Sequence, residues 1–254
     1  MQPNPNVIII AAGLGSRLRP HTASRPKCML DFGGKTLLER QLDIYHACGI
    51  TDISVIRGYL GDKINFPNVH YFDNIDYRNN NILGSLFCAE EKLVGETICG
   101  YSDILFEQRI VAALLESDND ISIVVDTDWK AYYEGRVDHP ETEAEKVIFS
   151  ETHEVERIGK GIRDCTHSEG EFIGMLKLSR AGAKLFRMHF HNAKKRFTQK
   201  PFQSASVFEK AYITDIIQEM VDSGVAVHCT LIQRGWKEID TVEDYEKAIA
   251  AFSG

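Results

Sequence analysis

The chain has 254 residues, of which 43% are hydrophobic and 26% charged, and its formal net charge is -8. This length and composition fit one large domain with a full hydrophobic core, and the acidic balance without a basic tract argues against nucleic acid as a partner. The apolar runs are far shorter than the about 20 residues of a membrane-spanning helix, and the start of the chain does not resemble a signal peptide. We therefore expect a cytoplasmic protein with no membrane partner, whose six scattered cysteines are reduced.

The first predicted element is a run of four β-branched residues, 7–10, which is typical of a strand buried in a parallel sheet. A run of small residues follows, where the backbone can turn tightly and approach a ligand. This run contains Ala11, Ala12, Gly13, Gly15 and Ser16. Cations come next, among them Arg17 and Lys27. Exposed N–H groups of a glycine turn beside several cations predict a polyphosphate site.

Two common phosphate-binding motifs do not fit this loop. A Rossmann fingerprint needs a third glycine where Leu18 stands. A Walker A loop needs lysine after its last glycine, whereas Gly15 is followed by Ser16 and Arg17. A structural glycine turn with solvated cations is the remaining alternative to a nucleotide-binding loop of another class.

Helices and strands then alternate along the chain. Thr36 and Glu39 form a capping-box pattern that predicts a helix ending near Gly49. Apolar runs predict strands over 53–56 and 69–72. The alternation indicates an α/β fold of Rossmann-like type, with a mostly parallel mixed sheet flanked by helices, in a single domain over residues 1–254.

Polar residues at two places in the middle of the chain are candidates for ligand binding. Asn81 and Ser85 precede or begin a helix predicted over 86–94, and they either read a base edge or belong to an ordinary surface loop. A strand over 96–101 ends in Ser102 and Asp103. An aspartate at the carboxyl end of a strand suits Mg²⁺, although it is also a common turn residue.

A strand over 121–125 ends in Asp126, and the chain then becomes highly charged with weak periodicity. We expect residues 127–170 to form a small inserted lobe of short strands and loops that binds the acceptor. Asp126 and Trp129 suit a cage for an organic cation. A solvated charged loop above packed aromatic residues is the alternative.

The last third predicts a strand over 171–178, helices over 180–190 and 212–221, and a strand over 225–232. His189 and His191, followed by three cations, indicate a solvated face or a mobile loop. A terminal helix begins after Thr241, which we expect to be its N-cap. Asp240 stands just before this helix, where an anion is favourable even without a ligand.

Three segments together carry a resemblance to a known family. The opening A-A-G-x-G-S-R-L-x-P-x-T-x-x-x-P-K resembles the nucleotidyltransferases that make nucleoside-diphosphate sugars and alcohols. The triplet S-D-I at 102–104 and the ending G-W-x-E-I-D-T-x-E-D-Y at 235–245 are similar to the same family. With Asn81 and Ser85, they resemble most the cytidylyltransferases that act on phosphocholine or phosphonates.

The resemblance implies roles for individual residues. The glycine loop and Ser102 would hold the nucleotide, Arg17 would meet the phosphates, and Lys27 would stabilise charge at the α-phosphorus. Mg²⁺ would be the cofactor, with Asp103 and Asp240 as its ligands. The resemblance also implies that Lys160, in the segment R-I-G-K, meets the phosphate of the acceptor. Asp126, Trp129 and Glu171 are further candidates beside the acceptor, the first two because acidic and aromatic side chains suit an organic cation.

The activity implied by the resemblance is transfer of CMP from CTP to a small phosphorylated or phosphonate acceptor, such as phosphocholine or 2-aminoethylphosphonate, with release of pyrophosphate. A sugar-1-phosphate nucleotidylyltransferase that uses UTP, GTP or dTTP stays open. So does a regulatory module that binds nucleotides without turnover, although such a module would have no chemical use for a pair of metal-binding carboxylates. The oligomeric state is open as well, with a homodimer among the expectations.

Overall fold

The computed structural model describes residues 5–162 and 168–252. The strands are β1 (Asn6–Ala11), β2 (Ile53–Arg57), β3 (Val69–Asp73), β4 (Thr97–Tyr101), β5 (Ile104–Phe106), β6 (Ile121–Asp126), β7 (Lys146–Phe149), β8 (Val155–Gly159), β9 (Ser168–Leu178), β10 (His228–Ile232) and β11 (Trp236–Glu238). The helices are α1 (Leu37–Ala47), α2 (Ile82–Leu86), α3 (Gln108–Leu115), α4 (Lys130–Tyr133), α5 (Arg180–Phe197), α6 (Ile213–Asp222) and α7 (Val242–Phe252).

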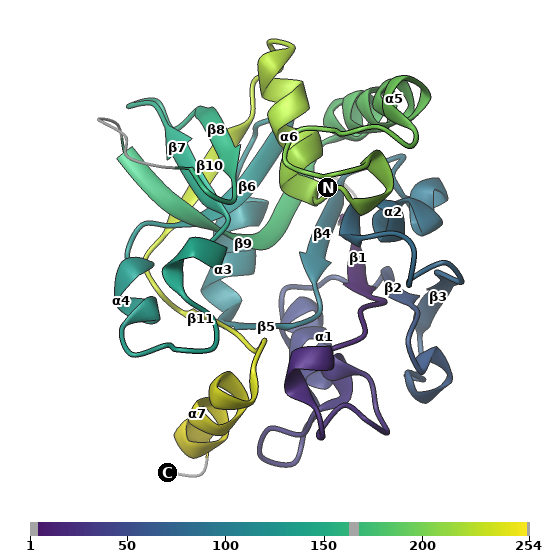
Figure 1. The fold of residues 1–254 in the computed structure, drawn as a ribbon, viewed down its shortest axis with the longest axis vertical. Coiled ribbons are helices and arrows are strands. Elements are labelled where there is room, and N and C mark those ends of the chain that lie inside the picture. Colours follow the sequence, from purple (N-terminus) through teal and green to yellow (C-terminus); the bar gives the residue numbers. More distant parts are fainter. Residues whose placement is uncertain (1–4, 163–167, 253–254) are drawn as a thin grey trace.

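The described residues form a nine-stranded sheet whose main path has the order β10-β6-β9-β4-β1-β2-β3 (Figure 1). The pairs of β1 with β2 and β4, of β2 with β3 and of β6 with β10 are parallel, whereas β9 is antiparallel to both of its neighbours on this path. The predicted mixed, mostly parallel sheet is therefore confirmed. A two-stranded sheet of β5 and β11 lies beside it.

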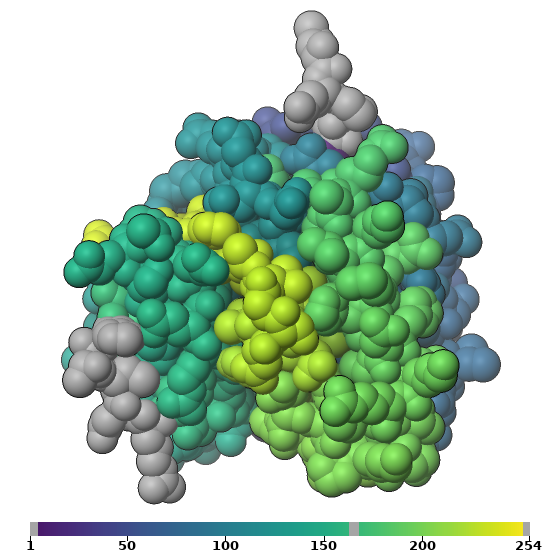
Figure 2. All heavy atoms as spheres, turned by 90° about the horizontal axis from the view of Figure 1, so that it is seen from above, coloured from purple at the N-terminus to yellow at the C-terminus, as the bar shows by residue number. Residues whose placement is uncertain are grey.

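Side chains that alternate along β1 build two cores on opposite faces of the sheet. Val7 and Ile9 pack with α1 and α3, while Ile8 and Ile10 pack with α2, α5 and α6. All four side chains are buried, as the β-branched run predicts. A view from above shows α6 in yellow-green between α5 and the teal segment that contains β7 and β8 (Figure 2).

The segment 127–170 contains α4, β7, β8 and the first residues of β9. Because β7 pairs with the first residues of β9, an inner strand of the main sheet, and also with β8, this segment adds two strands to that sheet. Residues 163–167 within it lie outside the described residues, and so does Cys165. The other five cysteines are free thiols, in agreement with the sequence. Within residues 5–162 and 168–252, no helix is both long and apolar enough to cross a membrane.

Several predicted boundaries are wrong. The helix expected over 86–94 begins earlier, as α2, and continues as a 3₁₀ segment, Phe87–Lys92, interrupted at Ala89. The helix expected over 180–190 extends to Phe197, so His189 and His191 lie on a helix, where the His191 Nε2 lies 2.7 Å from Glu90 Oε1. Four of the strands and α-helices given above, β5, α3, α4 and β11, are absent from the prediction.

Candidate active site

A cleft of about 360 Å³ lies where β1 and β4 end, the edge at which ligands bind open α/β sheets. Most of the residues predicted from the sequence line it. They are Ala11, Ala12, Gly13, Gly15, Ser16, Arg17, Lys27, Asn81, Ser85, Ser102, Asp103, Lys160, Glu171 and Asp240. The fold thus brings residues from the beginning, middle and end of the chain into one cavity.

The glycine loop contains one position where only glycine fits easily. Gly15 has φ 60° and ψ 32°, in the left-handed region, and a Cβ added there would lie 3.1 Å from the Cβ of Lys27. Gly13 is different, because a Cβ there would meet no heavy atom of the described residues within 4 Å. Gly15 therefore shapes the turn, and the space beside Gly13 is open to the cleft.

Lys27 joins the two aspartates that the sequence singles out. Its Nζ lies 2.9 Å from Asp103 Oδ2 and 2.7 Å from Asp240 Oδ1. Burial lowers the pKa of Lys27, but the charges of both aspartates outweigh this effect and raise it above its ordinary value. Burial alone would raise the pKa of Asp240, whereas the charge of Lys27 holds that pKa far below its usual range.

The donor set around this ammonium group suits a divalent cation. Within the described residues, the buried Oδ1 of Asp103 has no hydrogen-bond partner, and carboxylate oxygens are the ligands that Mg²⁺ prefers in proteins. Asp103 and Asp240 therefore fit the metal-binding role that the sequence predicts for them.

Asp240 is held in place by the start of α7. The carboxylate of Asp244 accepts from the backbone N–H of Asp240 and of Thr241, at 3.1 and 2.9 Å. The Thr241 hydroxyl accepts in turn from the Asp244 N–H at 3.2 Å, which supports its predicted capping role. Arg136 completes the arrangement with a two-bond contact to Asp244, at 3.0 Å for each bond. The sequence analysis missed Arg136 because 108 residues separate the two partners.

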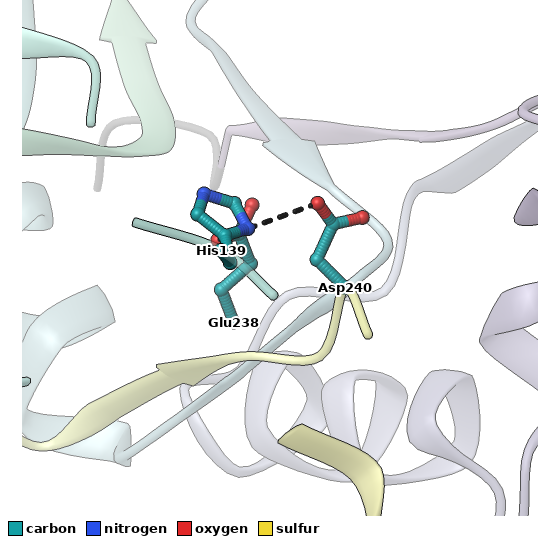
Figure 3. Close-up of side chains that lie close together, drawn as sticks. All are labelled: His139, Glu238 and Asp240. Atoms are coloured by element: carbon teal, nitrogen blue, oxygen red, sulfur yellow. Dashed lines mark ion pairs between the residues drawn. The ribbon is translucent and has the colours of Figure 1, made fainter. Parts of the chain in front are cut away.

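His139 and Glu238 face the other side of Asp240 (Figure 3). His139 Nδ1 lies 3.1 Å from Asp240 Oδ2 and 3.6 Å from Glu238 Oε2. The sequence analysis missed both residues. A signal for Glu238 was its position only two residues before Asp240, at the end of β11.

A network of amide groups lies beneath the part of the cleft lined by Asn81 and Ser85. The Nδ2 of the buried Asn74 donates to Ser85 Oγ at 2.8 Å and to Asn80 Oδ1 at 2.9 Å. Ser85 Oγ donates to the carbonyl of Asn81 at 3.1 Å. These bonds orient polar groups at the cleft wall, and Asn80 lines the cleft as well.

Acidic and aromatic residues line the remaining part of the cleft. Lys160 Nζ lies 3.0 Å from Glu143 Oε2 and 5.1 Å from the ring centroid of Tyr212. The Tyr133 hydroxyl donates to Glu171 Oε1. Glu171 is buried, and its Oε2 has no hydrogen-bond partner in the described part of the chain. Burial raises the pKa of Glu171 to about 8.

The structure does not bring Asp126 and Trp129 to the cleft, so their predicted place beside the acceptor is corrected. The Asp126 carboxylate is buried and accepts from the Trp236 indole N–H at 2.8 Å. Trp129 is also buried, and its ring packs at right angles to that of Tyr133. Both side chains are occupied by structural contacts, and Tyr133 is the aromatic residue of this segment that reaches the cleft.

Known cytidylyltransferases are similar to this chain in sequence and in fold. Over 255 aligned residues, the chain is 29% identical to the CTP:phosphoglutamine cytidylyltransferase of Campylobacter jejuni, with 96% of this chain and 99% of the relative covered. It is 27% identical over 196 residues to the 2-aminoethylphosphonate cytidylyltransferase of Lancefieldella rimae, covering 75% and 73% of the two chains. The fold is similar to the solved CTP:phosphocholine cytidylyltransferase of Streptococcus pneumoniae, with a TM-score of 0.71, 21% identity and 98% and 99% coverage.

A match to one protein family establishes the family to which the chain belongs. Residues 7–164 match the MobA-like NTP transferase domain, and this segment is more than half of the chain. It contains the glycine loop, Lys27 and Asp103, which line the cleft. The family resemblance predicted from the sequence is thus confirmed: the chain belongs to the MobA-like NTP transferases and is a nucleotidyltransferase.

Proposed function

We propose that the chain transfers CMP from CTP to a small acceptor that has a phosphate or phosphonate at one end and an ammonium group at the other. The observation that carries this proposal is a single cleft with a cationic part at Arg17 and Lys27 and an acidic, aromatic part at Tyr133 and Glu171. The relatives support it, because phosphoglutamine, phosphocholine and 2-aminoethylphosphonate each combine a phosphorus oxyanion with a nitrogen-bearing group.

The cationic part suits the triphosphate. The glycine loop offers backbone N–H groups, and the Arg17 side chain is 52% exposed, so it can turn from Asp240 toward a phosphate. Lys27 is half-buried beside both aspartates and is suited to neutralise charge at the α-phosphorus. Mg²⁺ held by Asp103 and Asp240 would supply further neutralisation of the triphosphate charge.

The proposed reaction is a direct displacement. An anionic oxygen of the acceptor forms a bond to the α-phosphorus of CTP, and the bond from that phosphorus to the bridging oxygen breaks to release pyrophosphate. No general base is required, because the attacking oxygen carries no proton that must be removed. The work of the protein is therefore positioning and electrostatic stabilisation.

The wall formed by the amide network suits the base. Asn81 and Ser85 line the cleft together with Asn80, and side-chain amides offer both donors and acceptors to a base edge. Ser102 directly follows β4 and precedes Asp103 in the sequence. It lines the same cleft. We assign these residues to nucleotide binding.

The acidic part suits the nitrogen-bearing end of the acceptor. Glu171 has a buried oxygen with no hydrogen-bond partner among the described residues, and it lines the cleft beside Tyr133. An ammonium group could pair with that oxygen and rest against the aromatic ring. Lys160, on the same side, is suited to hold the phosphorus oxyanion of the acceptor.

A pyrophosphate-release assay tests the proposal. The enzyme is incubated with Mg²⁺ and each of four NTPs against phosphocholine, 2-aminoethylphosphonate, a phosphorylated amino acid and glucose 1-phosphate. We expect turnover with CTP and one of the acceptors that contain nitrogen. Turnover with glucose 1-phosphate and another NTP would instead identify a sugar-1-phosphate nucleotidylyltransferase. CTP binding without any turnover would contradict the proposed acceptor class and favour a regulatory role.

A further inference from the structure

The two carboxylate oxygens of Asp240 face different partners. Oδ1 receives the ammonium group of Lys27 at 2.7 Å, on the side of Asp103. Oδ2 faces His139 Nδ1 at 3.1 Å, on the side of Glu238 (Figure 3). Asp240 therefore belongs to two clusters, and only the one with Asp103 is predicted from the sequence.

The atoms of the cluster around Oδ2 form ion pairs, with His139 and with Arg17, but these contacts lack hydrogen-bond geometry. The His139 side chain is 5% exposed, and neither its Nδ1 nor the Asp240 Oδ2 makes a hydrogen bond of acceptable geometry with any described residue. A buried imidazole nitrogen with no such bond is costly unless another group satisfies it. In the neutral tautomer that carries its proton on Nε2, this imidazole would offer a lone pair that faces two carboxylates, which suits a metal ion.

We propose that His139, Glu238 and Asp240 form a centre for a divalent transition-metal ion such as Mn²⁺. One ligand atom from each residue lies within 4.8 Å of the others, and two ligands on opposite sides of one such ion are about 4 Å apart. Small side-chain rotations therefore bring all three to a common ion. An imidazole beside two carboxylates selects an ion that accepts nitrogen as well as oxygen, whereas Mg²⁺ favours oxygen ligands.

The centre would also join two distant segments. His139 follows α4, while Glu238 ends β11 and Asp240 precedes α7. A bound ion therefore crosslinks the segment 127–170 to the C-terminal part of the chain. Arg17 contacts the same Oδ2 from an exposed position, so the ion would displace its guanidinium group toward the phosphate side of the cleft.

Metal binding without nucleotide is the direct test. The intact protein is titrated with Mn²⁺, and electron spin-echo spectroscopy then detects nitrogen coupled to the bound ion. We expect an imidazole coupling in the wild type that shifts when histidine is isotopically labelled. This measurement needs no substitution, so it does not depend on how a variant folds. Bound Mn²⁺ with no histidine coupling, or no bound Mn²⁺, would overturn the inference.

Substitutions then assign the coupling to one histidine. H139A should lose it and bind Mn²⁺ at least about tenfold more weakly. H70A is the matched control, because His70 is 63% exposed on β3 and should keep the coupling. A coupling that survives in H139A would refute the assignment.

The inference rests on the proposed function only in placing the ion beside the nucleotide cleft. D103N separates the two proposals, because Asp103 is not in this cluster. It should retain the coupled Mn²⁺ and lose turnover. If the wild type shows no transfer to any acceptor yet retains the coupling, the proposed function fails and the metal centre stands.

Discussion

Replacement of Arg136 by methionine tests how the structure positions Asp240. Arg136 Nε and Nη2 each donate to one oxygen of Asp244 at 3.0 Å, and both side chains are 3% exposed. Asp244 in turn accepts from the backbone N–H of Asp240. The substitution keeps much of the aliphatic volume and removes the charge, so it leaves a buried carboxylate without its partner.

The expected loss of stability follows from that burial. Removal of one partner from a buried ion pair costs about 3–5 kcal/mol. Asp244 still receives backbone N–H groups from Asp240 and Thr241, so we expect the lower end, about 3 kcal/mol. For a chain of this size, each kcal/mol changes the melting temperature by about 2–4 °C. R136M should therefore melt roughly 6–12 °C below the wild type.

Thermal unfolding followed by circular dichroism compares the melting temperatures, and K247A, on the same helix as Asp244, is the control. Lys247 pairs with Glu243 at 2.6 Å on the exposed face of α7, where an ion pair contributes little. K247A should melt close to the wild type. Turnover of R136M, measured well below its melting temperature, should also fall, because the segment that carries Asp240 loosens. Equal melting temperatures for the two variants would refute the importance of the buried pair, and full activity of R136M would refute its link to Asp240.

Three other predictions concern the cleft. K27A should lower kcat by a factor of about 10²–10³ through the loss of one stabilising charge. K35A removes a lysine from an exposed ion pair and should retain wild-type kinetics. Equal kcat values for K27A and K35A would contradict the assigned role of Lys27. The pKa of Glu171 is raised to about 8, so its carboxyl is mostly neutral below that pH. The KM for phosphocholine should therefore fall as the pH rises from about 7 to about 9. This pH dependence should be absent in E171Q. G13A should raise the KM for CTP without a change in melting temperature. G15A should melt at a lower temperature, because residue 15 has a φ of 60° and an added Cβ there is crowded. A lower melting temperature for G13A than for G15A would contradict the description of the loop.

Elements with strong local signals were predictable. The β-branched run gives β1, and the capping box at Thr36 is present, with the N–H of Glu39 donating to the threonine hydroxyl at 3.2 Å. The antiparallel insertion of β9 between β4 and β6 was not predictable, because it depends on pairing between distant residues. The 3₁₀ segment after α2 was also missed, because its apolar residues suit either type of helix.

The site shows why the type of residue alone is not sufficient. Lys27 and Asp240 meet although 213 residues separate them, and both were predicted because the segments that contain them resemble the same family. Asp126 and Trp129 also formed a plausible pattern, an acid beside an aromatic ring, which serves equally for a cation cage and for a buried hydrogen bond. In this fold the acid accepts from Trp236, and the acid and aromatic ring that lie at the cleft are Glu171 and Tyr133, which we propose for the acceptor instead. Burial and hydrogen-bond partners, which only the three-dimensional structure supplies, decide between the two uses of the same residues.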